Sequence, residues 1–460
     1  MNPLSNLVYR RLFLAQITSL LGTGLATVAL ALLAWDLAGD RAGAVLGTAL
    51  GIKMVAYVGV TPIVSALTRH LPRRALLVTL DCIRAACMAC MLYVDAIWQV
   101  LLLIFVLNAC SAGFTPAFQA TIPEVLPDEA TYTRALSLSR LAYDLEALAS
   151  PSLAAIALAL TSYHTLFASN AIAFVASGAL VLSVALPRSS EARARTGLLT
   201  ATVFGIRCYL HTPRLRGLLA LSMAAATGSA MVIVNTVVVV RDQLGGDQVD
   251  TALALGAYGL GSMAVAVALP QSLERLGDRV FMISGAVLIT AALCFCSIAL
   301  SALGLGAVWL LLGAGTSLIQ TPAGRLLARS SNANTRTAVY AAQFSLSHAC
   351  WLITYPVAGW VGAAVSLEVA SLTLASIAAG ACLLALAVWP ANDPTALEHT
   401  HPTTTHTHPH QHDQHHPHAH RPAKVAKNHE HEHTHAPITH THPFVIDEHH
   451  SVWPATNRLS

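Results

Sequence analysis

Long apolar runs recur almost end to end between Leu12 and Trp389, and each reaches the roughly 18 residues that a helix needs to cross about 30 Å of hydrocarbon. A single water-soluble core cannot absorb so many runs. Only 11% of the residues are charged and the mean hydropathy is +0.59, whereas soluble domains are roughly 25% charged. The sequence therefore predicts an all-α membrane protein whose partner is the lipid bilayer.

Polar breaks separate the apolar runs into twelve expected spans, an even number that puts both termini on one side of the membrane. The N-terminus runs into the first span without a small-residue cleavage site, so we expect that span to be retained. The spans are expected near residues 12–35, 44–67, 75–95, 97–116, 135–160, 164–186, 216–240, 250–270, 280–301, 303–322, 337–360 and 365–389.

Basic residues indicate the orientation of these spans. If the N-terminus is cytoplasmic, the inner loops up to residue 390 hold seventeen Lys or Arg residues, and the outer loops hold only Arg41 and Arg241. This bias follows the positive-inside rule and places both termini in the cytoplasm. The formal charge of +3 is too small to indicate nucleic acid as a partner.

The two halves of the apolar region share landmarks in the same order, 206 or 205 residues apart. These are Asp36 and Asp242, Arg73 and Arg279, Thr115-Pro116-Ala117 and Thr321-Pro322-Ala323, and Ser150-Pro151 and Tyr355-Pro356. Such weak self-similarity is typical of parallel repeats about the membrane normal, with a substrate site at their interface. We expect two pseudo-symmetric six-helix bundles. The expected division is 1–190 for the N-terminal bundle, 191–213 for a cytoplasmic linker, 214–390 for the C-terminal bundle and 391–460 for a disordered, histidine-rich tail.

This architecture resembles the major facilitator superfamily. The loop at 65–74 looks like the superfamily's loop motif G-x-x-x-D-R-x-G-R-R, with the basic pair present as Arg73 and Arg74. Arg69 stands where the motif has its Asp, so the acidic member of the usual charge lock is missing here. The resemblance implies alternating access between two rigid bundles.

Ionisable side chains inside spans cost at least about 2.5–3.5 kcal/mol each, so those that are present become candidates for function. Asp81 and Arg84 are three residues apart at the start of the third span, the spacing of an ion pair on one helix face. We interpret them as a structural pair that could substitute for the acid missing from the loop motif. The role of Lys53, midway along the second span, stays open.

The fifth span holds Arg140, Asp144 and Glu146. Arg140 and Asp144 share one face, whereas Glu146 lies about 200° round the helix from Asp144. In one interpretation, Asp144 faces the transport pathway and Arg140 partly neutralises its charge. In the other, that pair is structural and Glu146, with Tyr143 on its side, lines the pathway. A cation and proton antiporter needs a carboxylate that can be ionised with cargo and protonated without it, and either acid could serve.

His348 is the only histidine well inside a span, and Tyr355 follows seven residues later, on the same helix face. Both are therefore candidates for the pathway. A lone membrane histidine is also explained as a hydrogen-bonded packing residue, so both interpretations stay open.

The composition changes abruptly at Ala391, and 18 of the 22 histidines lie in the last 70 residues. Pro and Thr interleave them and resist regular structure, so imidazoles are free to converge on an ion. Neutral imidazole suits nickel, copper, cobalt and zinc, and its pKa of about 6.5 leaves it mostly unprotonated at cytoplasmic pH. The expected metal ligands are His406, His408, His410, His412, His415, His416, His418, His420, His429, His431, His433 and His435.

Three segments narrow the resemblance, namely AWDLAG at 34–39, AVLGTAL at 44–50 and SHACWLITYPVAGW at 347–360. They look like the nickel-resistance exporters of this superfamily, of NreB type, which also end in histidine-rich tails. The likeness covers essentially all 460 residues. It implies efflux of nickel, with cobalt as a second cargo, across a bacterial inner membrane in exchange for protons, conferring metal resistance.

Other functions fit parts of the same sequence. The alternative is an exporter of an organic compound, or of a siderophore or other metal chelate, with a metal-sensing tail, and a third candidate is a non-transporting metal receptor or store. No nucleophile elbow or phosphate loop occurs in a soluble segment, so we expect no enzyme. We also expect a monomer that needs no cofactor, with nickel, cobalt, zinc or copper only as cargo and tail ligand.

Overall fold

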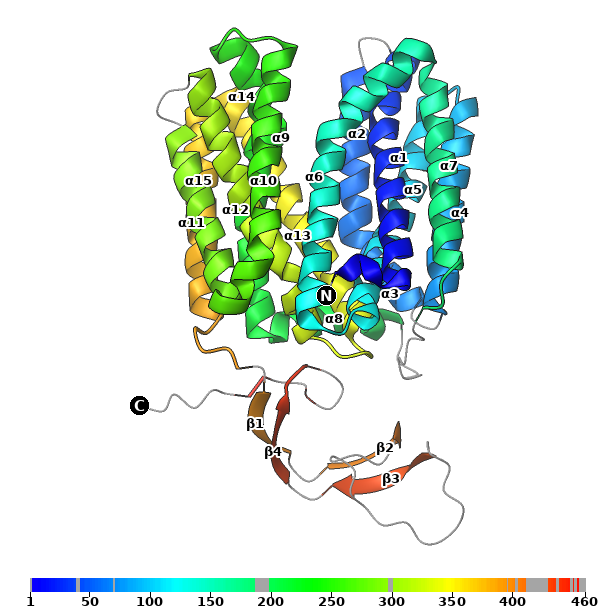
Figure 1. Ribbon diagram of the computed structural model, residues 1–460, viewed down its shortest axis with the longest axis vertical. Helices are drawn as coiled ribbons and strands as arrows, with labels where there is room; N and C mark the ends of the chain where they lie inside the picture. The colour runs from blue at the N-terminus through cyan, green and yellow to red at the C-terminus, as the bar shows by residue number, and fades with distance from the viewer. Residues whose placement is uncertain are drawn as a thin grey trace.

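The computed structural model describes residues 2–38, 42–68, 71–186, 198–296, 301–394, 396–401, 404–410, 429–435, 438–446, 450 and 453–454. Helices make up almost all of this part of the chain and group into two bundles, with the strands of the C-terminal tail beneath one end (Figure 1). The N-terminus lies at the same end, which we call the tail end.

The N-terminal bundle holds six membrane-crossing stretches. The second stretch runs from α2 through the π-helical turn η3 into α3. The elements are η1 (Pro3–Ser5), α1 (Leu7–Ala38), α2 (Ala42–Val55), η3 (Ala56–Val60), α3 (Thr61–Thr68), α4 (Arg73–Cys90), η4 (Met91–Tyr93), α5 (Ile97–Val125), α6 (Glu129–Leu160) and α7 (Tyr163–Leu182).

The C-terminal bundle holds six further stretches, two of which continue into the π-helical turns η5 and η6. The elements are α9 (Pro213–Val238), η5 (Val239–Gln243), α10 (Gln248–Leu276), α11 (Asp278–Cys296), α12 (Ala302–Arg329), α13 (Arg336–Pro356), η6 (Val357–Val361), α14 (Gly362–Ala364) and α15 (Leu367–Val388). A shorter helix, α8 (Leu198–His211), lies within the expected linker and was not anticipated from the sequence.

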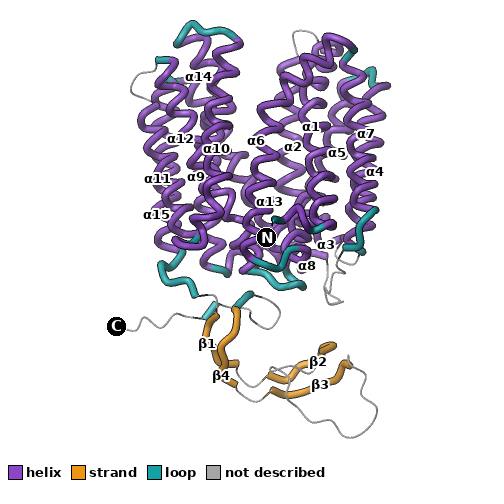
Figure 2. Tube along the Cα trace, viewed as in Figure 1, coloured by secondary structure: helices purple, strands orange, loops and turns teal. Residues whose placement is uncertain are grey.

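The twelve expected spans are confirmed in number and order. Nine of these stretches are long and apolar enough, within the described residues, to cross a membrane on composition alone. The other three, α1, α6 and α13, lie among them in the two bundles (Figure 2). Helices α5 and α12 extend beyond the expected ends to Val125 and Arg329, and the residues at the expected ends, Pro116 and Pro322, lie inside these helices.

Two helices, α6 and α13, make equivalent contacts between the bundles. Helix α6 packs on α10 and α12, and α13 packs on α5 and on the stretch α2–η3–α3. When about 206 is added to the residue numbers, α6 corresponds to α13, α2 to α10 and α5 to α12. Each contact is therefore repeated with the halves exchanged, the pattern produced by a pseudo-two-fold axis along the membrane normal.

Glycine allows the tightest helix contact inside the C-terminal bundle. Helices α10 and α12 cross where Gly261 faces the Leu310 carbonyl and Gly313 faces the Tyr258 carbonyl, and a Cβ at either position would collide with that oxygen. Lipid gives helices no hydrophobic reason to associate, so close backbone approach supplies the van der Waals contact instead. Helix α6 packs against both members of this pair.

Four short strands, not anticipated from the sequence, pair within the described part of the tail. They are β1 (Ala396–His401), β2 (Thr404–His410), β3 (His429–His435) and β4 (Ile438–Pro443). The strands form two antiparallel ladders, β1 with β4 and β2 with β3. Histidine alternates with threonine in parts of β1, β2 and β4 and mainly with glutamate in β3, and β-branched threonine favours extended backbone.

Candidate functional site

A polar network joins the two bundles at the middle of α6. The Arg140 Nη2 atom lies 2.9 Å from Asp144 Oδ1, and Asp144 Oδ2 accepts a hydrogen bond of 2.6 Å from the Ser262 hydroxyl of α10. Arg140 donates from Nε to Ser262 Oγ at 3.0 Å and from Nη1 to Gln320 Oε1 of α12 at 2.6 Å. The ion pair is therefore both a contact along one helix and a bridge from the N-terminal to the C-terminal bundle.

A second cluster lies where η3 of the N-terminal bundle meets α13 of the C-terminal bundle. The Tyr57 ring packs edge-on against the rings of His348 and Phe344, with centroid separations of 4.7 and 4.9 Å. His348 also lies 4.2 Å from Phe344 and 5.0 Å from Trp351. One turn before Tyr57, Lys53 places its Nζ atom 5.6 Å from the Tyr57 ring centroid. Aromatic rings and one cation thus surround the imidazole.

The tautomer of His348 follows from its hydrogen bond. Its Nδ1 atom lies 2.7 Å from the Phe344 carbonyl oxygen, and a carbonyl can only accept. Nδ1 therefore carries the proton, and Nε2 of the neutral ring keeps a free lone pair. A histidine held by its other nitrogen in this way is oriented as metal-binding histidines are.

Glu146 and Tyr143 belong to this second cluster. Glu146 interacts electrostatically with Lys53 and with Tyr143. Tyr143 also lies near Tyr57 and is hydrogen-bonded to Gln16 of α1. The two acids of α6 therefore point to different partners, Asp144 to the other bundle and Glu146 to the lysine and aromatic cluster, as their angular separation along the helix requires.

Tyr355 lies apart from His348. It packs against the core of the C-terminal bundle and interacts with Tyr258 of α10, whose hydroxyl is 3.2 Å from that of Ser229. Although Tyr355 is two turns from His348 along α13, its partners are residues of its own bundle.

Asp81 and Arg84 form an ion pair inside the N-terminal bundle. The Arg84 guanidinium carbon lies 4.0 Å from the Phe114 ring centroid and 4.4 Å from that of Phe174, while Asp81 accepts a hydrogen bond of 2.9 Å from Ser177. These residues tie α4, α5 and α7 together. The pair lies within one bundle and, among the described residues, makes no hydrogen bond or ion pair with the loop motif at 65–74.

Ion pairs close the seam between the bundles at the tail end. Glu124, near the end of α5, contacts Arg73 Nη1 at 2.5 Å in its own bundle and Arg336 Nη1 at 3.4 Å at the start of α13. Arg73 also donates to the Thr337 hydroxyl of α13 at 3.3 Å. Of the loop pair, Arg73 is buried in this network and Arg74 is exposed. Glu124 therefore supplies the acid that the loop motif lacks.

A second ion pair joins α6 to α12. Arg325 Nη2 lies 2.6 Å from Glu129 Oε1, and Arg325 Nε lies 3.3 Å from Asp278 Oδ1 of α11. Asp128, which precedes Glu129, is the N-cap of α6. Hydrogen bonds from Thr131 lower the pKa of Asp128, so the cap stays ionised at neutral pH and fixes the turn that presents Glu129.

Two uncharged contacts complete this closure, which together with the ion pairs we call the tail-end gate. The hydroxyls of Tyr132 and Tyr340 are 2.9 Å apart, and each is 3.2 Å from the Gly324 carbonyl oxygen. The Ser345 hydroxyl of α13 donates to the Val58 carbonyl at 2.5 Å. That carbonyl has lost its helical donor, because the residue four positions on is a proline and has no N–H.

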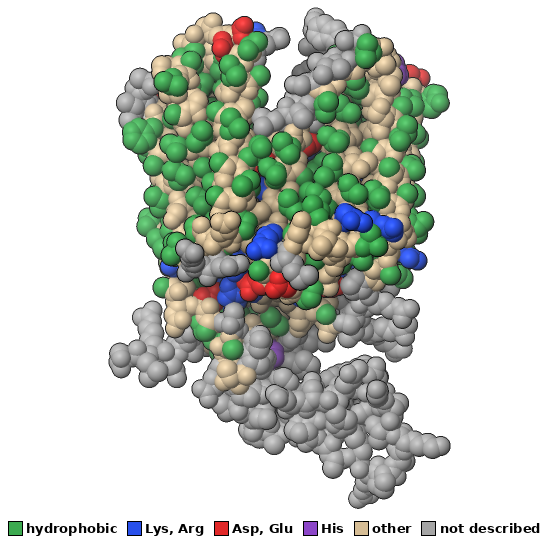
Figure 3. Space-filling model, in the orientation of Figure 1, with side chains coloured by type: hydrophobic (Ala, Val, Ile, Leu, Met, Phe, Trp, Pro, Cys, Tyr) green, Lys and Arg blue, Asp and Glu red, His purple; other side chains and the backbone are tan. Residues whose placement is uncertain are grey.

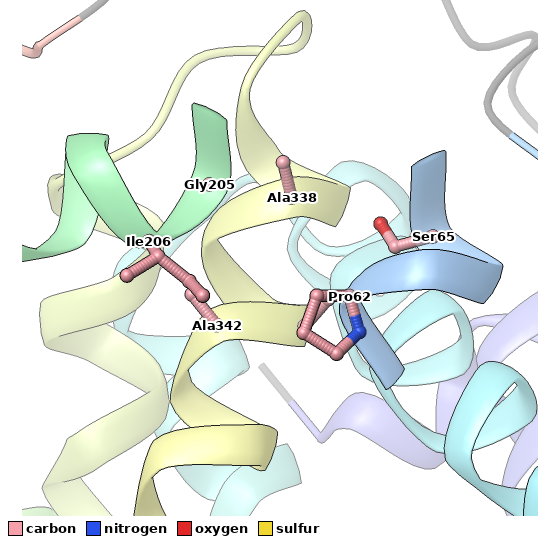
Figure 4. Close-up of a pocket in the computed structure, with 7 residues that line it drawn as sticks. Pro62, Ser65, Gly205, Ile206, Ala338 and Ala342 are labelled. Carbon is pink, nitrogen blue, oxygen red and sulfur yellow. The ribbon is translucent and has the colours of Figure 1, made fainter. Parts of the chain in front are cut away.

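The linker helix α8 packs on α3 of one bundle and α13 of the other. Gly205 lies so close to the Ala338 carbonyl that a Cβ would collide with it, and the Tyr209 hydroxyl donates to Gln343. A shallow crevice marks this three-helix contact; it is lined by Pro62, Ser65, Gly205, Ile206, Ala338, Ala341 and Ala342 (Figure 4).

The bundles diverge toward the end opposite the tail, where Figure 1 shows them apart and Figure 3 shows the surface hollowed between them. The interbundle hydrogen bonds and ion pairs described above run from the middle of α6 to the tail end. Figure 3 also shows charged side chains gathered low on the seam. The structure is therefore closed at the tail end and open at the opposite end.

Some of the expected histidine ligands of the tail lie within the residues that the structure describes, and others do not. His406, His408 and His410 lie on β2 and His429, His431, His433 and His435 on β3, whereas His412, His415, His416, His418 and His420 fall outside the described residues. The ladder register pairs histidine with histidine at three alternate positions: His406 with His433, His408 with His431 and His410 with His429. Among the described residues, no group of three or more His, Cys, Asp or Glu side chains could hold a metal ion.

Sequence reasoning did not identify several residues of these networks. Ser262 and Gln320 are uncharged, and nothing in the sequence distinguishes them from other polar residues in spans. Glu124 and Glu129 carried a signal that could have been used, since the expected loop between residues 116 and 135 holds three acids and only one basic residue, whereas the other inner loops are mainly basic.

Comparison with known proteins gives one family. The model for the Major Facilitator Superfamily matches residues 12–271 and 219–409, and no curated protein sequence matches the chain. The human organic anion transporter MFSD10 (TETRAN) is similar in structure, with a TM-score of 0.73 at 13% identity over 82% of this chain and 99% of that one. The E. coli fucose:proton symporter FucP is also similar, with a TM-score of 0.65 at 14% identity over 82% and 97%.

A structure of FucP in the outward conformation has a TM-score of 0.64 at 14% identity over the same shares of the two chains. At these identities the likeness concerns the fold. Because the family model covers most of the chain and the two pseudo-symmetric six-helix bundles agree with it, this multi-pass membrane protein belongs to the major facilitator superfamily of secondary transporters.

Proposed function

We propose that this transporter exports a divalent transition-metal cation, nickel first and cobalt second, from the cytoplasm in exchange for protons. The supporting observation is the tail: 18 histidines within 70 residues, with three histidine pairs in register across β2 and β3. Alternate positions of a strand share one side of a ladder, so the six histidine positions of these three pairs lie on one side of the β2–β3 ladder. Imidazole is a ligand suited to nickel, cobalt, copper and zinc.

The proposed orientation puts the tail end in the cytoplasm of a bacterial cell, with the protein in the inner membrane. The positive-inside bias of the loops supports it. In this orientation the described conformer is closed to the cytoplasm and open to the outside, the state in which cargo is released and protons are taken up.

For the cargo we propose Glu146 and His348 as ligands inside the membrane. Glu146 and His348 lie on opposite bundles and each interacts electrostatically with Lys53, so a cation held by both would join α6 to α13. Two protein ligands leave room for water on the ion, which nickel accepts in octahedral sites.

For the proton we propose Asp144. A protonated Asp144 leaves Arg140 without its counter-ion in a buried seam, and removing one partner of a buried ion pair costs about 3–5 kcal/mol. Protonation therefore weakens the bridge to Ser262 and Gln320 and favours a rearrangement of the bundles. Return of the empty carrier would depend on this step.

Transport by the purified protein tests the proposal. Proteoliposomes with an imposed proton gradient should accumulate nickel against its own gradient, and the uptake should collapse when an ionophore removes the proton gradient. Nickel that equilibrates without responding to the proton gradient would contradict exchange. No movement of nickel, cobalt, zinc or copper would exclude metal transport altogether.

One observation favours a second candidate, export of an organic anion or of a metal chelate, with the tail sensing the metal. Lys53 places a positive charge beside Glu146 and His348, and Tyr57, Phe344 and Trp351 surround them with aromatic faces. The Trp351 Nε1 atom is buried and has no acceptor within the described residues. A cation, aromatic faces and a free N–H donor suit an anionic organic ligand.

The two candidates differ in what the same liposomes carry. Bare nickel is the cargo if uptake occurs with the aquo ion alone and falls when a chelator such as citrate is added outside. An anionic chelate is the cargo if uptake requires the chelator and the chelator travels with the metal in a fixed ratio.

A further inference from the structure

The end of the tail returns to the bundles. Phe444 and Ile446, just after β4, are each 2% exposed and pack in the core of the C-terminal bundle, which Trp453 also contacts. The first residue of β1, Ala396, is paired with Pro443 at the end of β4. The histidine segment therefore leaves the bundle and rejoins it at one place, beneath the tail end (Figure 1).

A buried cation lies at this place. Arg214, the second residue of α9, is 1% exposed, its Nη2 atom lies 3.3 Å from Asp393 Oδ1, and its guanidinium carbon lies 5.1 Å from the Trp453 ring centroid. Within the described residues, none of its three guanidinium nitrogens makes a hydrogen bond. A desolvated guanidinium is attracted to an indole face, so Trp453 covers a charge that Asp393 only partly compensates.

The residues of this contact also touch one another. The Phe444 ring lies 5.1 Å from the Trp453 ring and 4.7 Å from the His450 ring. Asp393 accepts a hydrogen bond of 3.1 Å from Trp389 Nε1, at the end of α15. Aromatic packing and burial in the bundle core thus hold the end of the tail, and Arg214 contacts both Trp453 and Asp393, the latter at the start of the tail.

We propose that Phe444, Ile446, His450 and Trp453 form an anchor that holds the histidine segment as a closed loop against the base of α9 and α15, and that this closure preorganises the β2–β3 ladder for a divalent transition-metal ion. The inference rests on the metal-binding part of the proposed function and not on the identity of the cargo. The chain entropy that is lost when the two ends come together is lost during folding and not during metal binding. Metal ions then bind a loop that is already closed, and binding in turn stabilises the anchor.

Hydrogen exchange and nickel titration of the full-length protein in detergent test the two parts. The amides of β1, β4 and the anchor should be protected in the wild type and should lose protection in Trp453→Ala and in Arg214→Ala. Both variants should bind their first nickel ion about fivefold or more weakly, the lower end of common coupling free energies. The double variant should be no weaker than either single one, because each change releases the same anchor.

Arg216→Ala is the matched control, since Arg216 is an exposed arginine on the same turn of α9, and it should behave as the wild type. Unprotected anchor amides in the wild type would overturn the anchor. Released anchors with unchanged nickel affinity would overturn preorganisation. A wild type that binds no nickel would overturn the metal-binding part of both proposals, while exchange still decides whether the anchor exists.

Discussion

Lys53 lies in the cluster that we propose binds the cargo, so a change in its charge should change the affinity for the cargo. At an effective dielectric constant of about 20, an ammonium repels each positive charge about 6 Å away by roughly 3 kcal/mol. If bare nickel binds at Glu146 and His348, Lys53→Met should tighten its binding by about tenfold or more. If the cargo is an anionic chelate, the same change should weaken binding by at least as much.

Lys53→Arg is the control for this measurement, because it keeps the charge and changes only the shape. Equilibrium binding of nickel, with and without citrate, gives the sign in each case. Equal affinities for the wild type, Lys53→Met and Lys53→Arg would mean that the cargo binds away from this cluster.

Asp144 is the second residue with a specific prediction. Asp144→Asn mimics the protonated acid at all pH values, so proton-driven exchange should be lost while downhill exchange of cargo for cargo continues. The expected loss of uphill transport is about 100-fold, within the range that a buried pair of 3–5 kcal/mol allows. Asp95→Asn, at an exposed aspartate between α4 and α5, should transport as the wild type does, and pH-dependent uphill transport by Asp144→Asn would remove Asp144 from the proton pathway.

At the scale of elements, the close contact of α8 with α13 makes the linker part of the gate. Gly205→Leu should push α8 away from Ala338 and destabilise the conformer that is closed at the tail end. We expect labelling of a cysteine placed at Ser65, in the crevice of Figure 4, to become about tenfold faster, which corresponds to about 1.4 kcal/mol. Gly256→Leu is the control, since a Cβ at Gly256 meets nothing within 4 Å; equal labelling rates in the two variants would show that α8 does not hold the gate.

The π-helical turn η3 lies next to Pro62, which changes the backbone hydrogen bonding of the second span. Pro62 has no N–H to give Val58, so the carbonyl is free for Ser345 of the other bundle and the helix widens at Tyr57, next to His348. A lost backbone hydrogen bond within one element thus becomes a contact between two.

At the scale of the whole molecule, Glu124 connects the two bundles at the tail end. It contacts Arg73 of one bundle and Arg336 of the other, so Glu124→Gln should weaken the tail-end closure by about 2 kcal/mol, the size of a hydrogen bond to a charged group. The conformer open at the tail end should gain population by roughly 30-fold. Distances between spin labels on the two bundles at the tail end measure this shift; an unchanged distance distribution would show that the gate does not depend on this acid.

The tail as a unit should assist transport without being required for it. A chain that ends at Pro394 keeps Asp393 beside Arg214 and should still export nickel, but less well at low cytoplasmic nickel. Nickel binding by the full tail should weaken as pH falls through about 6.5, because a protonated imidazole has no lone pair to donate. The measurement is cell nickel content with the full and shortened chains, and equal export at every nickel concentration would show that the tail does not collect cargo.

The sequence by itself determined the twelve spans and their pairing into two related halves, because hydrocarbon admits only long helices with their backbone bonds satisfied internally. It also placed Arg140 and Asp144 on one helix face and Glu146 on another, which helical geometry alone requires. Only the tertiary structure decided that Arg140 reaches Ser262 and Gln320, that Lys53 lies beside His348, and that Tyr355 turns to its own bundle. These contacts join residues about 100 or more positions apart in sequence, or depend on how a helix is rotated, and a bilayer-spanning helix that is apolar on nearly every face does not specify its own rotation.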